Sequence, residues 1–343
     1  MRVGVVGCGE ISNVHIPHVQ RIAGVEIVGV CDTDKEKAQR LAHRFGIRHA
    51  YGAISEMLRE RRPEVVHILT PPQSHKELSI EAMEAGCHVL VEKPMALNVK
   101  EAEEMLSTSL RRRVTLGVCH NYLFEPALLE AKELVARGLV GKVLSVEIFW
   151  RIFPNGIRDR CRTSGWIYDL PGGVFHEVAA HPVYLQMEFL KTLKVVSAIS
   201  KKTGSDLPIP SDDLHVLFDG QLGVGSFSSS IYVNPHLVFL NIFGTEMTIH
   251  VDLTTNTLVK FRRSGGGSVL RAMVNIDHGL QLLSKTVGSK VQALLGQRKP
   301  GHRILIEKFY ESLREGTKPP VTGEDGRAVV DVLDQIWVKL GWQ

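Results

Sequence analysis

Residues Arg2 to Ile22 read RVGVVGCGEISNVHIPHVQRI, and this stretch decides the fold of the first half of the chain. Its opening run of valines is typical of a buried parallel strand, and Gly7 and Gly9 follow at once. Glycine permits a sharp turn and lets the main chain approach a pyrophosphate, while a helix from about Ile11 would point its first N–H groups at that phosphate. The stretch therefore predicts a strand–turn–helix unit that binds a dinucleotide.

Asp32 supports this interpretation from the end of the next apolar run. It follows Gly7 by 25 residues, where a carboxylate can accept hydrogen bonds from an adenosine ribose. A carboxylate there repels a 2′-phosphate, and no arginine follows directly, so NAD is favoured; Lys35 and Lys37 leave NADP possible. Ser12 stands at the third small position of the glycine motif, where we expect it to crowd the helix–strand contact.

The first 121 residues alternate short apolar runs with amphipathic helical stretches. The runs that we expect to be strands are Val3–Val6, Glu26–Cys31, Val65–Leu69, His88–Val91 and Val114–Cys119. Repeated βα units predict an α/β domain with a doubly wound parallel sheet, the Rossmann arrangement, over residues 1–121.

Residues 122–343 have a different pattern. Long strand-like stretches such as KVLSVEIFWRI and HLVFLNIFG follow one another with few helices between them, which is typical of an antiparallel sheet. We expect an α+β domain with a large, mainly antiparallel open sheet for substrate binding and oligomerisation, with the C-terminal helix free to pack back on the first domain. Residues 268–297 are expected to form one or two amphipathic helices packed on their own domain, with a membrane-surface or lid role as alternatives.

Polar side chains follow the strands of the first domain where these strands end. Thr70, Pro71 and His75 follow one strand, Glu92 and Lys93 the next, and Asn121 the last. Because ligands of open parallel sheets bind at the carboxyl ends of the strands, these groups are expected to converge on one site. Pro94 would fix the exit from the strand, and we expect the Lys93–Pro94 peptide bond to be cis.

These motifs resemble the Gfo/Idh/MocA oxidoreductases, a family that includes glucose–fructose oxidoreductase and inositol dehydrogenase. The resemblance rests on GCGEIS, CDTD, TPPQSH, GCHVLVEKP, HNYLFEP and GGVFHEVAAH, and covers essentially the whole chain. It implies hydride transfer between a secondary hydroxyl of a sugar, polyol or nucleotide sugar and NAD(P), with Lys93 catalytic. The coenzyme contacts that we expect are Gly7, Gly9, Glu10, Ile11, Asp32, Thr70, Pro71, His75, Glu92, Lys93 and Asn121.

The motif GGVFHEVAAH supplies the rest of the expected catalytic site. Glu177 and His181 are four residues apart, hence on one face of a helix, and the resemblance implies that His181 accepts the substrate proton. Glu177 stands where the family usually has aspartate, so its role in orienting the histidine is an open question. His176 is the competing histidine, about 140° around the helix from His181. Trp166 is expected to contact substrate.

Arginines are dense in RIFPNGIRDRCRTSGW, the segment that leads to this helix. Arg160 and Arg162 are candidate clamps for a phosphate, nucleotide diphosphate or carboxylate of the substrate, and a solvated basic loop is the alternative. The substrate hypothesis that follows is an anionic sugar.

The composition sets further limits. With 44% apolar and 23% charged residues and a net charge of +4, nothing favours nucleic-acid binding, and no run approaches the roughly 18 apolar residues of a membrane span. The five cysteines lack CxxC spacing and the chain starts directly with a strand, so we expect free thiols and a cytoplasmic protein. The spacing of histidines and acids suggests no metal site.

Two other functional classes stay open. Some relatives use NAD to oxidise and re-reduce a sugar while hydrolysing a glycosidic bond, and others are non-catalytic NAD-binding regulators. The retained Lys93 and His181 argue against a regulator. By analogy with relatives, the exposed face of the second sheet is expected to form a homodimer or homotetramer, and substrate to lie between the nicotinamide and that open face.

Overall fold

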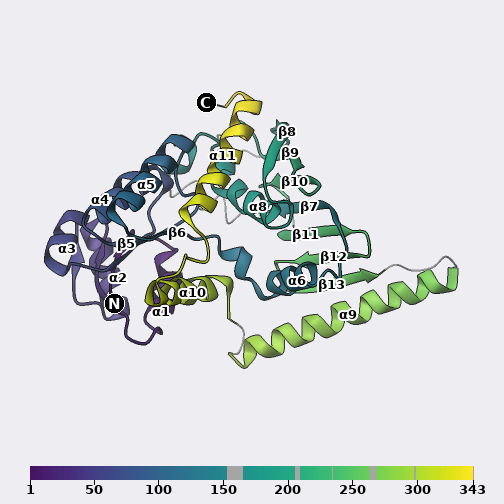
Figure 1. Cartoon of the computed structure of the whole chain (residues 1–343), viewed down its shortest axis with the longest axis horizontal. Helices are drawn as coiled ribbons and strands as arrows, with labels where there is room; N and C mark the ends of the chain where they lie inside the picture. Colours follow the sequence, from purple (N-terminus) through teal and green to yellow (C-terminus); the bar gives the residue numbers. More distant parts are fainter. Residues whose placement is uncertain (153–164, 205–208, 234, 263–267, 297–298, 343) are drawn as a thin grey trace. The chain divides into compact units, whose positions relative to one another are not determined.

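The structure is a computed structural model that describes residues 1–152, 165–204, 209–233, 235–262, 268–296 and 299–342. It divides into two compact units (Figure 1). The first unit comprises residues 1–121 and 302–334, and the second comprises residues 122–301 and 335–343. The division after Asn121 coincides with the domain boundary proposed from the sequence. From the sequence, we expect residues 302–334 in the second domain, whereas in the structure they belong to the first unit.

The first unit is built on a six-stranded parallel sheet with the order β3-β2-β1-β4-β5-β6, the doubly wound order of Rossmann domains. Its strands are β1 (Arg2–Val6), β2 (Glu26–Cys31), β3 (Ala50–Tyr51), β4 (Val65–Ile68), β5 (His88–Val91) and β6 (Leu116–Val118). Its helices include α1 (Ser12–Val19), α2 (Lys35–Phe45), α3 (Ile54–Arg61), α4 (His75–Glu84), α5 (Val99–Arg112) and α10 (Gly301–Glu315), with α11 (Gly323–Leu340) ending in the second unit. The predicted fold class of this unit is confirmed.

Local signals explain where the helices begin and end. The Asp34 carboxylate accepts a hydrogen bond from the Lys37 N–H and caps α2, and Gly46 ends that helix in the left-handed conformation at φ 67°. Asn98 caps α5 in the same way by accepting from the Glu101 N–H.

Helices pack on both faces of this sheet, as the register of the strands shows. Gly4 faces Met57 of α3, with so little space that an added Cβ would lie 2.7 Å from the Met57 methyl carbon. His67 lies beside Val5 in the neighbouring strand and so points to the opposite face, where it contacts Tyr310 of α10. The helix α10, distant in sequence, thus completes the core of the coenzyme domain.

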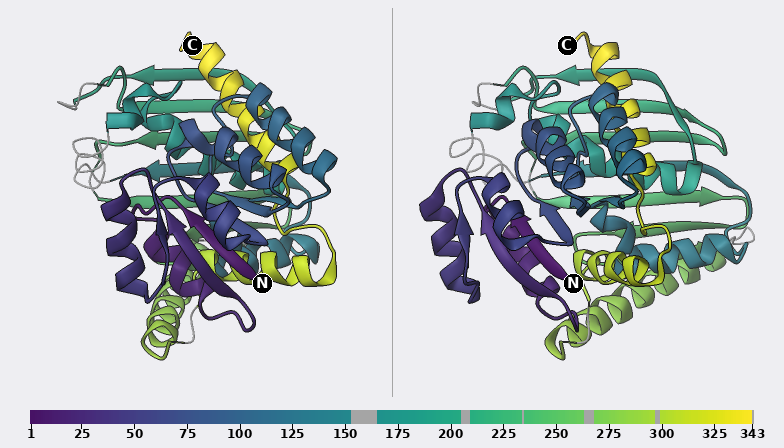
Figure 2. Two further views of the ribbon diagram at one scale, coloured as in Figure 1. Left: turned by 90° about the vertical axis from the view of Figure 1, so that its left-hand side faces the viewer. Right: turned by 60° about the vertical axis from the view of Figure 1, so that its left-hand side comes forward.

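The second unit contains a seven-stranded sheet with the order β13-β12-β11-β7-β10-β9-β8, whose strands run side by side in Figure 2. All its neighbours are antiparallel except β7 and β10, so the predicted mainly antiparallel sheet is confirmed. The strands are β7 (Val143–Arg151), β8 (Leu193–Lys201), β9 (Asp213–Gly220), β10 (Val224–Ser230), β11 (Leu237–Gly244), β12 (Met247–Asp252) and β13 (Thr257–Arg262), with helices α6 (Pro126–Ala136), α8 (Val174–Leu190) and α9 (Ser268–Leu294).

One face of this sheet is covered and the other is open. Along β7, Ile148 and Trp150 are buried on the side that carries α8, while Phe149 is exposed on the other side. Helix α9 departs from the sequence-based expectation, because its large apolar side chains are exposed rather than packed on the domain. Within the described residues, no helix has both the length and the apolar character needed to cross a membrane.

Candidate coenzyme and catalytic site

The glycine turn after β1 has the geometry that a pyrophosphate requires. Gly7 has φ +95°, and an added Cβ would lie 2.6 Å from the carbonyl oxygen of Leu69, so no other residue fits without strain. A Cβ on Gly9 would meet nothing within 4 Å, which leaves open space above the turn. The expected crowding by Ser12 is wrong, because its buried hydroxyl donates a 2.5 Å hydrogen bond to the Gly9 carbonyl oxygen.

Asp32 is tied to this turn by its carboxylate. One oxygen accepts the Cys8 N–H at 2.8 Å and lies 3.5 Å from the Lys37 ammonium, and the other accepts the Asp34 N–H at 3.0 Å. Since a carboxylate offers about four acceptor positions, Asp32 keeps capacity for the hydroxyls of a ribose. Its orientation is therefore fixed before any ligand arrives.

Helix α1 begins where the turn ends, and its first N–H groups, on Ser12, Asn13 and Val14, lie 3.0–3.3 Å from the carbonyl oxygens three residues earlier. Ile11 is its N-cap and supplies no side-chain hydrogen bond, and the first turn carries no acidic residue. The dipole of such a helix end attracts an anion. With the open space at Gly9 and the carboxylate of Asp32, the residues present fit a dinucleotide. Glu10 and Ile11, which we expect to contact the coenzyme, lie beside the turn.

The segment after β4 is organised by His75. This side chain is fully buried, with Nδ1 2.9 Å from the Pro94 carbonyl oxygen and Nε2 2.8 Å from the Thr70 carbonyl oxygen. Burial lowers its pKa although both carbonyls favour the protonated ring. His75 therefore joins the ends of β4 and β5. Its fully buried side chain differs from our expectation that it contacts the coenzyme directly. Thr70, which accepts a 2.8 Å hydrogen bond from Ser74, and Pro71 lie at the surface of this segment.

Glu92 and Lys93 follow β5 at the same edge of the sheet. Glu92 is buried, and one of its oxygens accepts the Lys93 N–H at 3.2 Å. Lys93 is half-buried, and the Lys93–Pro94 peptide bond is cis, as predicted. Asn121, which ends the first segment of this unit, is also buried after β6.

A buried hydrogen-bonded chain, which sequence reasoning missed, leads to Glu92. Nε2 of His15 lies 3.0 Å from a Glu92 oxygen, Nδ1 of His15 lies 3.0 Å from Nδ1 of His67, and Nε2 of His67 lies 2.9 Å from the Tyr310 hydroxyl. All four side chains are less than a tenth exposed. The chain connects helices α1 and α10 to the acid that precedes Lys93.

The proton positions in this chain follow from the pKa values at its ends. Burial raises the pKa of Glu92, but the hydrogen bond and the charge of His15 outweigh it and lower that pKa to about 2. Burial raises the pKa of Tyr310 and lowers that of His67, so the phenol keeps its proton and His67 is neutral. An ionised Glu92 only accepts hydrogen bonds, so His15 donates to it from Nε2.

Cys119 joins this cluster, with Sγ 3.8 Å from Nε2 of His15. The ligating atoms of His15, Glu92 and Cys119 lie within 4.8 Å of one another, as around a metal ion. However, burial raises the pKa of Cys119 well above its usual value, and His15 already donates to Glu92. The cluster is thus satisfied by hydrogen bonds, and the expected absence of a metal stays a prediction for elemental analysis.

In the second unit, His181 is held on helix α8 by three aromatic residues. Its ring stacks on Trp150 at 5.0 Å between centroids with an interplanar angle of 6°, and Tyr122 meets it edge-on at 4.9 Å. Nδ1 of His181 lies 2.8 Å from the hydroxyl of Tyr184, which also accepts the Tyr122 N–H at 3.3 Å. If Nδ1 donates to this oxygen, Nε2 keeps its lone pair and can accept a proton.

Two further findings concern this helix. Trp150 is 3% exposed and stacks on His181, so this histidine lies on the covered side of the sheet, while the expected position of the substrate stays a prediction. His176 is fully buried and accepts a 3.0 Å hydrogen bond from the Trp337 indole, which gives it a structural role. Glu177 in α8 and Trp166 are half-buried, whereas Arg160 and Arg162 lie outside the described residues.

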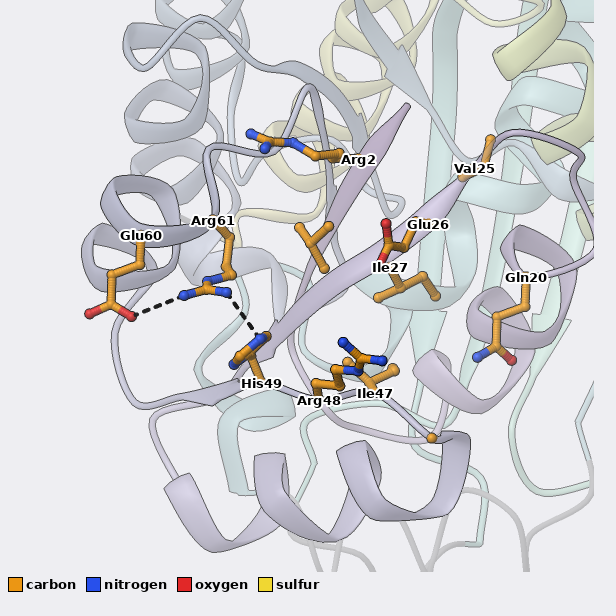
Figure 3. Close-up of a pocket in the computed structure, with 12 residues that line it drawn as sticks. Arg2, Gln20, Val25, Glu26, Ile27, Ile47, Arg48, His49, Glu60 and Arg61 are labelled. Carbon is orange, nitrogen blue, oxygen red and sulfur yellow. Dashed lines mark hydrogen bonds and ion pairs between the residues drawn. The ribbon is translucent and has the colours of Figure 1, made fainter.

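A pocket at the opposite edge of the first sheet is separate from this site. It is lined by Arg2, Glu26 and Arg48, with Arg61 bound to His49 and Glu60 (Figure 3). Arg2 and Glu26 begin β1 and β2, so the pocket lies at the amino ends of the strands. The coenzyme site is at their carboxyl ends, and the pocket has no part in it.

Comparisons with known proteins agree with this geometry. Residues 1–120 match the oxidoreductase family with the NAD-binding Rossmann fold, GFO_IDH_MocA. Residues 1–120 of the chain therefore belong to the Gfo/Idh/MocA oxidoreductase family. An oxidoreductase of Rhizobium meliloti, ORF334, is 27% identical over 98% of this chain and 96% of its own length. Myo-inositol 2-dehydrogenase of Thermotoga maritima is 23% identical over 95% of this chain and 92% of its own.

The likeness to solved structures concerns the fold of the chain. The WlbA dehydrogenase of Bordetella pertussis, in complex with NADH and UDP-GlcNAcA, has a TM-score of 0.82 at 23% identity and covers 99% of this chain and 95% of its own. Both units of the chain therefore have counterparts in the fold of that dehydrogenase.

Proposed function

We propose that this chain is an NAD-dependent dehydrogenase that acts on a secondary hydroxyl of a sugar, polyol or nucleotide sugar. The observation that carries the proposal is the shared edge at which the glycine turn, Asp32 and Lys93 follow β1, β2 and β5. NAD supplies the hydride acceptor when bound. The substrate class is supported by the relatives, one named for myo-inositol and one bound to UDP-GlcNAcA.

We assign the following roles to the chain's own residues. Gly7, Gly9 and Asp32 hold the coenzyme, with contacts from Glu10, Ile11, Thr70, Pro71, Glu92 and Asn121. Lys93 and Nε2 of His181 are the groups that can take the substrate proton, a contribution typically worth about 10²–10⁴-fold in rate. Glu177 and Trp166 would contact substrate beside His181.

The test is a panel of sugars, sugar acids and nucleotide sugars with NAD⁺ and NADP⁺, followed by nicotinamide absorbance. Lys93→Ala should lower kcat by about 10²–10⁴-fold on the best substrate, and Lys100→Ala, an exposed lysine of α5, is the control. Release of an aglycone without net reduction of NAD⁺ would instead identify the NAD-recycling glycosidase. Binding of NAD without turnover of any substrate would favour a regulator.

The charge of the substrate is a separate part of the proposal. Arg160 and Arg162 would clamp an anionic group such as a carboxylate or diphosphate. Arg160→Ala and Arg162→Ala should then raise KM for acidic substrates and leave neutral polyols unchanged. Equal effects on both substrate types contradict this assignment.

We also propose a homodimer or homotetramer in the cytoplasm. Support for assembly comes from the open face of the second sheet, where Phe149, Ile199, Leu217 and Val224 are exposed. The cytoplasmic assignment is supported by the cysteines: among the described residues, four are buried and free of disulfides. Burial, followed by the charge of Asp32, raises the pKa of the Cys8 thiol to about 12, so this thiol stays protonated.

A further inference from the structure

Helix α9 contacts its own domain through polar side chains. It lies alongside the edge strand β13 (Figure 1), where the Gln281 amide accepts the Lys260 N–H at 3.0 Å and donates to the Lys260 carbonyl oxygen at 3.2 Å. The Lys285 ammonium lies 2.8 Å from a carboxylate oxygen of Glu130 in α6. Gln281 thus closes the sheet edge as a neighbouring strand would, and the polar side of the helix is the inner side.

The outer side of α9 is apolar. Its outer stripe consists of Met273, Ile276, Leu280, Leu283, Val287 and Leu294, each between 54% and 87% exposed. Soluble proteins rarely leave a continuous row of large apolar side chains in water unless a partner covers it. The orientation is the reverse of that in an ordinary surface helix, whose apolar face meets the core.

The spacing of the outer stripe indicates what covers it. The steps of three and four residues alternate from Met273 to Val287, and Lys290 takes the next position before Leu294. This is the 3.5-residue repeat of a helix that packs against another helix, whereas a helix on a bilayer surface needs only an apolar face with the 3.6-residue period. The helix has 27 residues and would span about 40 Å, long enough for several layers of contact.

The stripe is also complementary to itself when reversed. In an antiparallel pair centred between Leu280 and Leu283, Leu280 faces Leu283 of the partner subunit, and Ile276 faces Val287 of the partner subunit. Met273 then faces Lys290 of the partner subunit. Asp277, whose carboxylate accepts the Gln281 amide at 2.6 Å, lies one helical turn after Met273 at the border of the stripe. Each contact occurs twice by symmetry, as in an isologous interface.

We propose that the outer stripe of α9 is a self-association surface on which two copies of this chain pair their α9 helices antiparallel about a two-fold axis. This surface is distinct from the open sheet face and does not depend on the proposed enzymatic activity. The Asp277 carboxylate and the Lys290 ammonium set the register of the pair.

The first experiment measures the mass of the full-length chain by size-exclusion chromatography with light scattering over a range of concentrations. Leu280→Glu combined with Leu283→Glu should reduce the mass of the assembly at least twofold. Leu282→Glu, which changes an apolar residue that is 48% exposed outside the stripe, should leave the mass unchanged. Circular dichroism verifies that both variants are folded. An unchanged mass in the double variant, or a monomeric wild type, overturns the proposal.

The second experiment tests the register and the bilayer alternative. Asp277→Lys and Lys290→Glu should each weaken association about tenfold, and the two together should restore it; failure of the restoration contradicts the antiparallel register. Vesicles of phosphatidylcholine and phosphatidylserine are the comparison partner. The alternative outcome is that the wild type binds these vesicles as a monomer and that the combined Leu280→Glu and Leu283→Glu substitutions abolish that binding. This outcome would assign the stripe to a membrane surface and overturn the proposal.

Discussion

Nε2 of His15 lies 3.0 Å from a carboxylate oxygen of Glu92, and the other oxygen of Glu92 accepts the N–H of Lys93. The acid next to the proposed catalytic lysine is therefore held in place by a histidine from the helix that begins at the glycine turn. Through this pair, the two ends of the proposed coenzyme site are joined inside the first unit.

This pair predicts how stability depends on pH. The pKa of Glu92 in the folded chain, about 2, is below its usual 4.5, so its ionised form stabilises the fold above pH 4.5 and this stability is lost as pH falls toward 2. In His15→Ala, burial remains and the hydrogen bond is gone, so the pKa of Glu92 rises and the loss begins at higher pH. We expect about 3–5 kcal/mol lower free energy of unfolding at neutral pH.

The measurement is urea unfolding of both proteins across this pH range. Val14→Ala, a half-buried residue without a titratable group on the same helix, is the matched control and should keep the wild-type pH dependence. If His15→Ala and the wild type lose stability at the same pH, the low pKa of Glu92 does not come from His15.

The glycine turn gives a prediction in which two neighbouring substitutions act differently. Gly7→Ala should destabilise the fold by about 1–3 kcal/mol, because its Cβ would strike the Leu69 carbonyl in a strained backbone conformation. Gly9→Ala should leave the melting temperature unchanged, since its Cβ meets no protein atom, and should weaken NAD binding instead. Thermal unfolding and NAD titration separate the two effects; a Gly9→Ala variant with wild-type NAD affinity would place the pyrophosphate elsewhere.

Coenzyme preference should depend on the charge of Asp32. Asp32→Asn keeps an acceptor for the Cys8 N–H and removes the charge that repels a 2′-phosphate. We expect the ratio of kcat/KM for NAD⁺ over NADP⁺ to fall about tenfold, a change of about 1.4 kcal/mol. Lys100→Ala, an exposed lysine of α5, is the control for general charge effects. An unchanged ratio in Asp32→Asn would remove Asp32 from the ribose site.

The sequence predicted those parts of the molecule that depend on nearby residues. The strands His88–Val91 and Glu26–Cys31 have the bounds expected from their apolar runs, and the cis bond at Pro94 was anticipated. Strand β3 was missed because its two residues are too short for any periodicity. The amphipathic pattern of α9 showed which side of the helix is apolar, but not that the polar side would meet the domain.

The hydrogen-bonded chain behind Glu92 could not be predicted from one sequence. His67 and Tyr310 are 243 residues apart, and His15 and Glu92 are 77 apart, so no motif spacing connects them. Each histidine alone has the pattern of an ordinary core residue. Only the return of α10 to the first sheet brings the four side chains together. Tyr184, by contrast, had a local signal, because it stands three residues after His181 on the same helix.

Tyr184 provides the last prediction, because its hydroxyl takes the place beside Nδ1 of His181 for which the sequence suggested Glu177. Tyr184→Phe removes the oxygen that fixes the imidazole, so we expect kcat to fall about tenfold with little change in KM. The stacking on Trp150 should keep the ring in place and limit the loss. Glu177→Gln is the comparison, and Tyr232→Phe, an exposed tyrosine, controls for loss of a hydroxyl. Full activity in Tyr184→Phe together with a large loss in Glu177→Gln would return the orienting role to the acid.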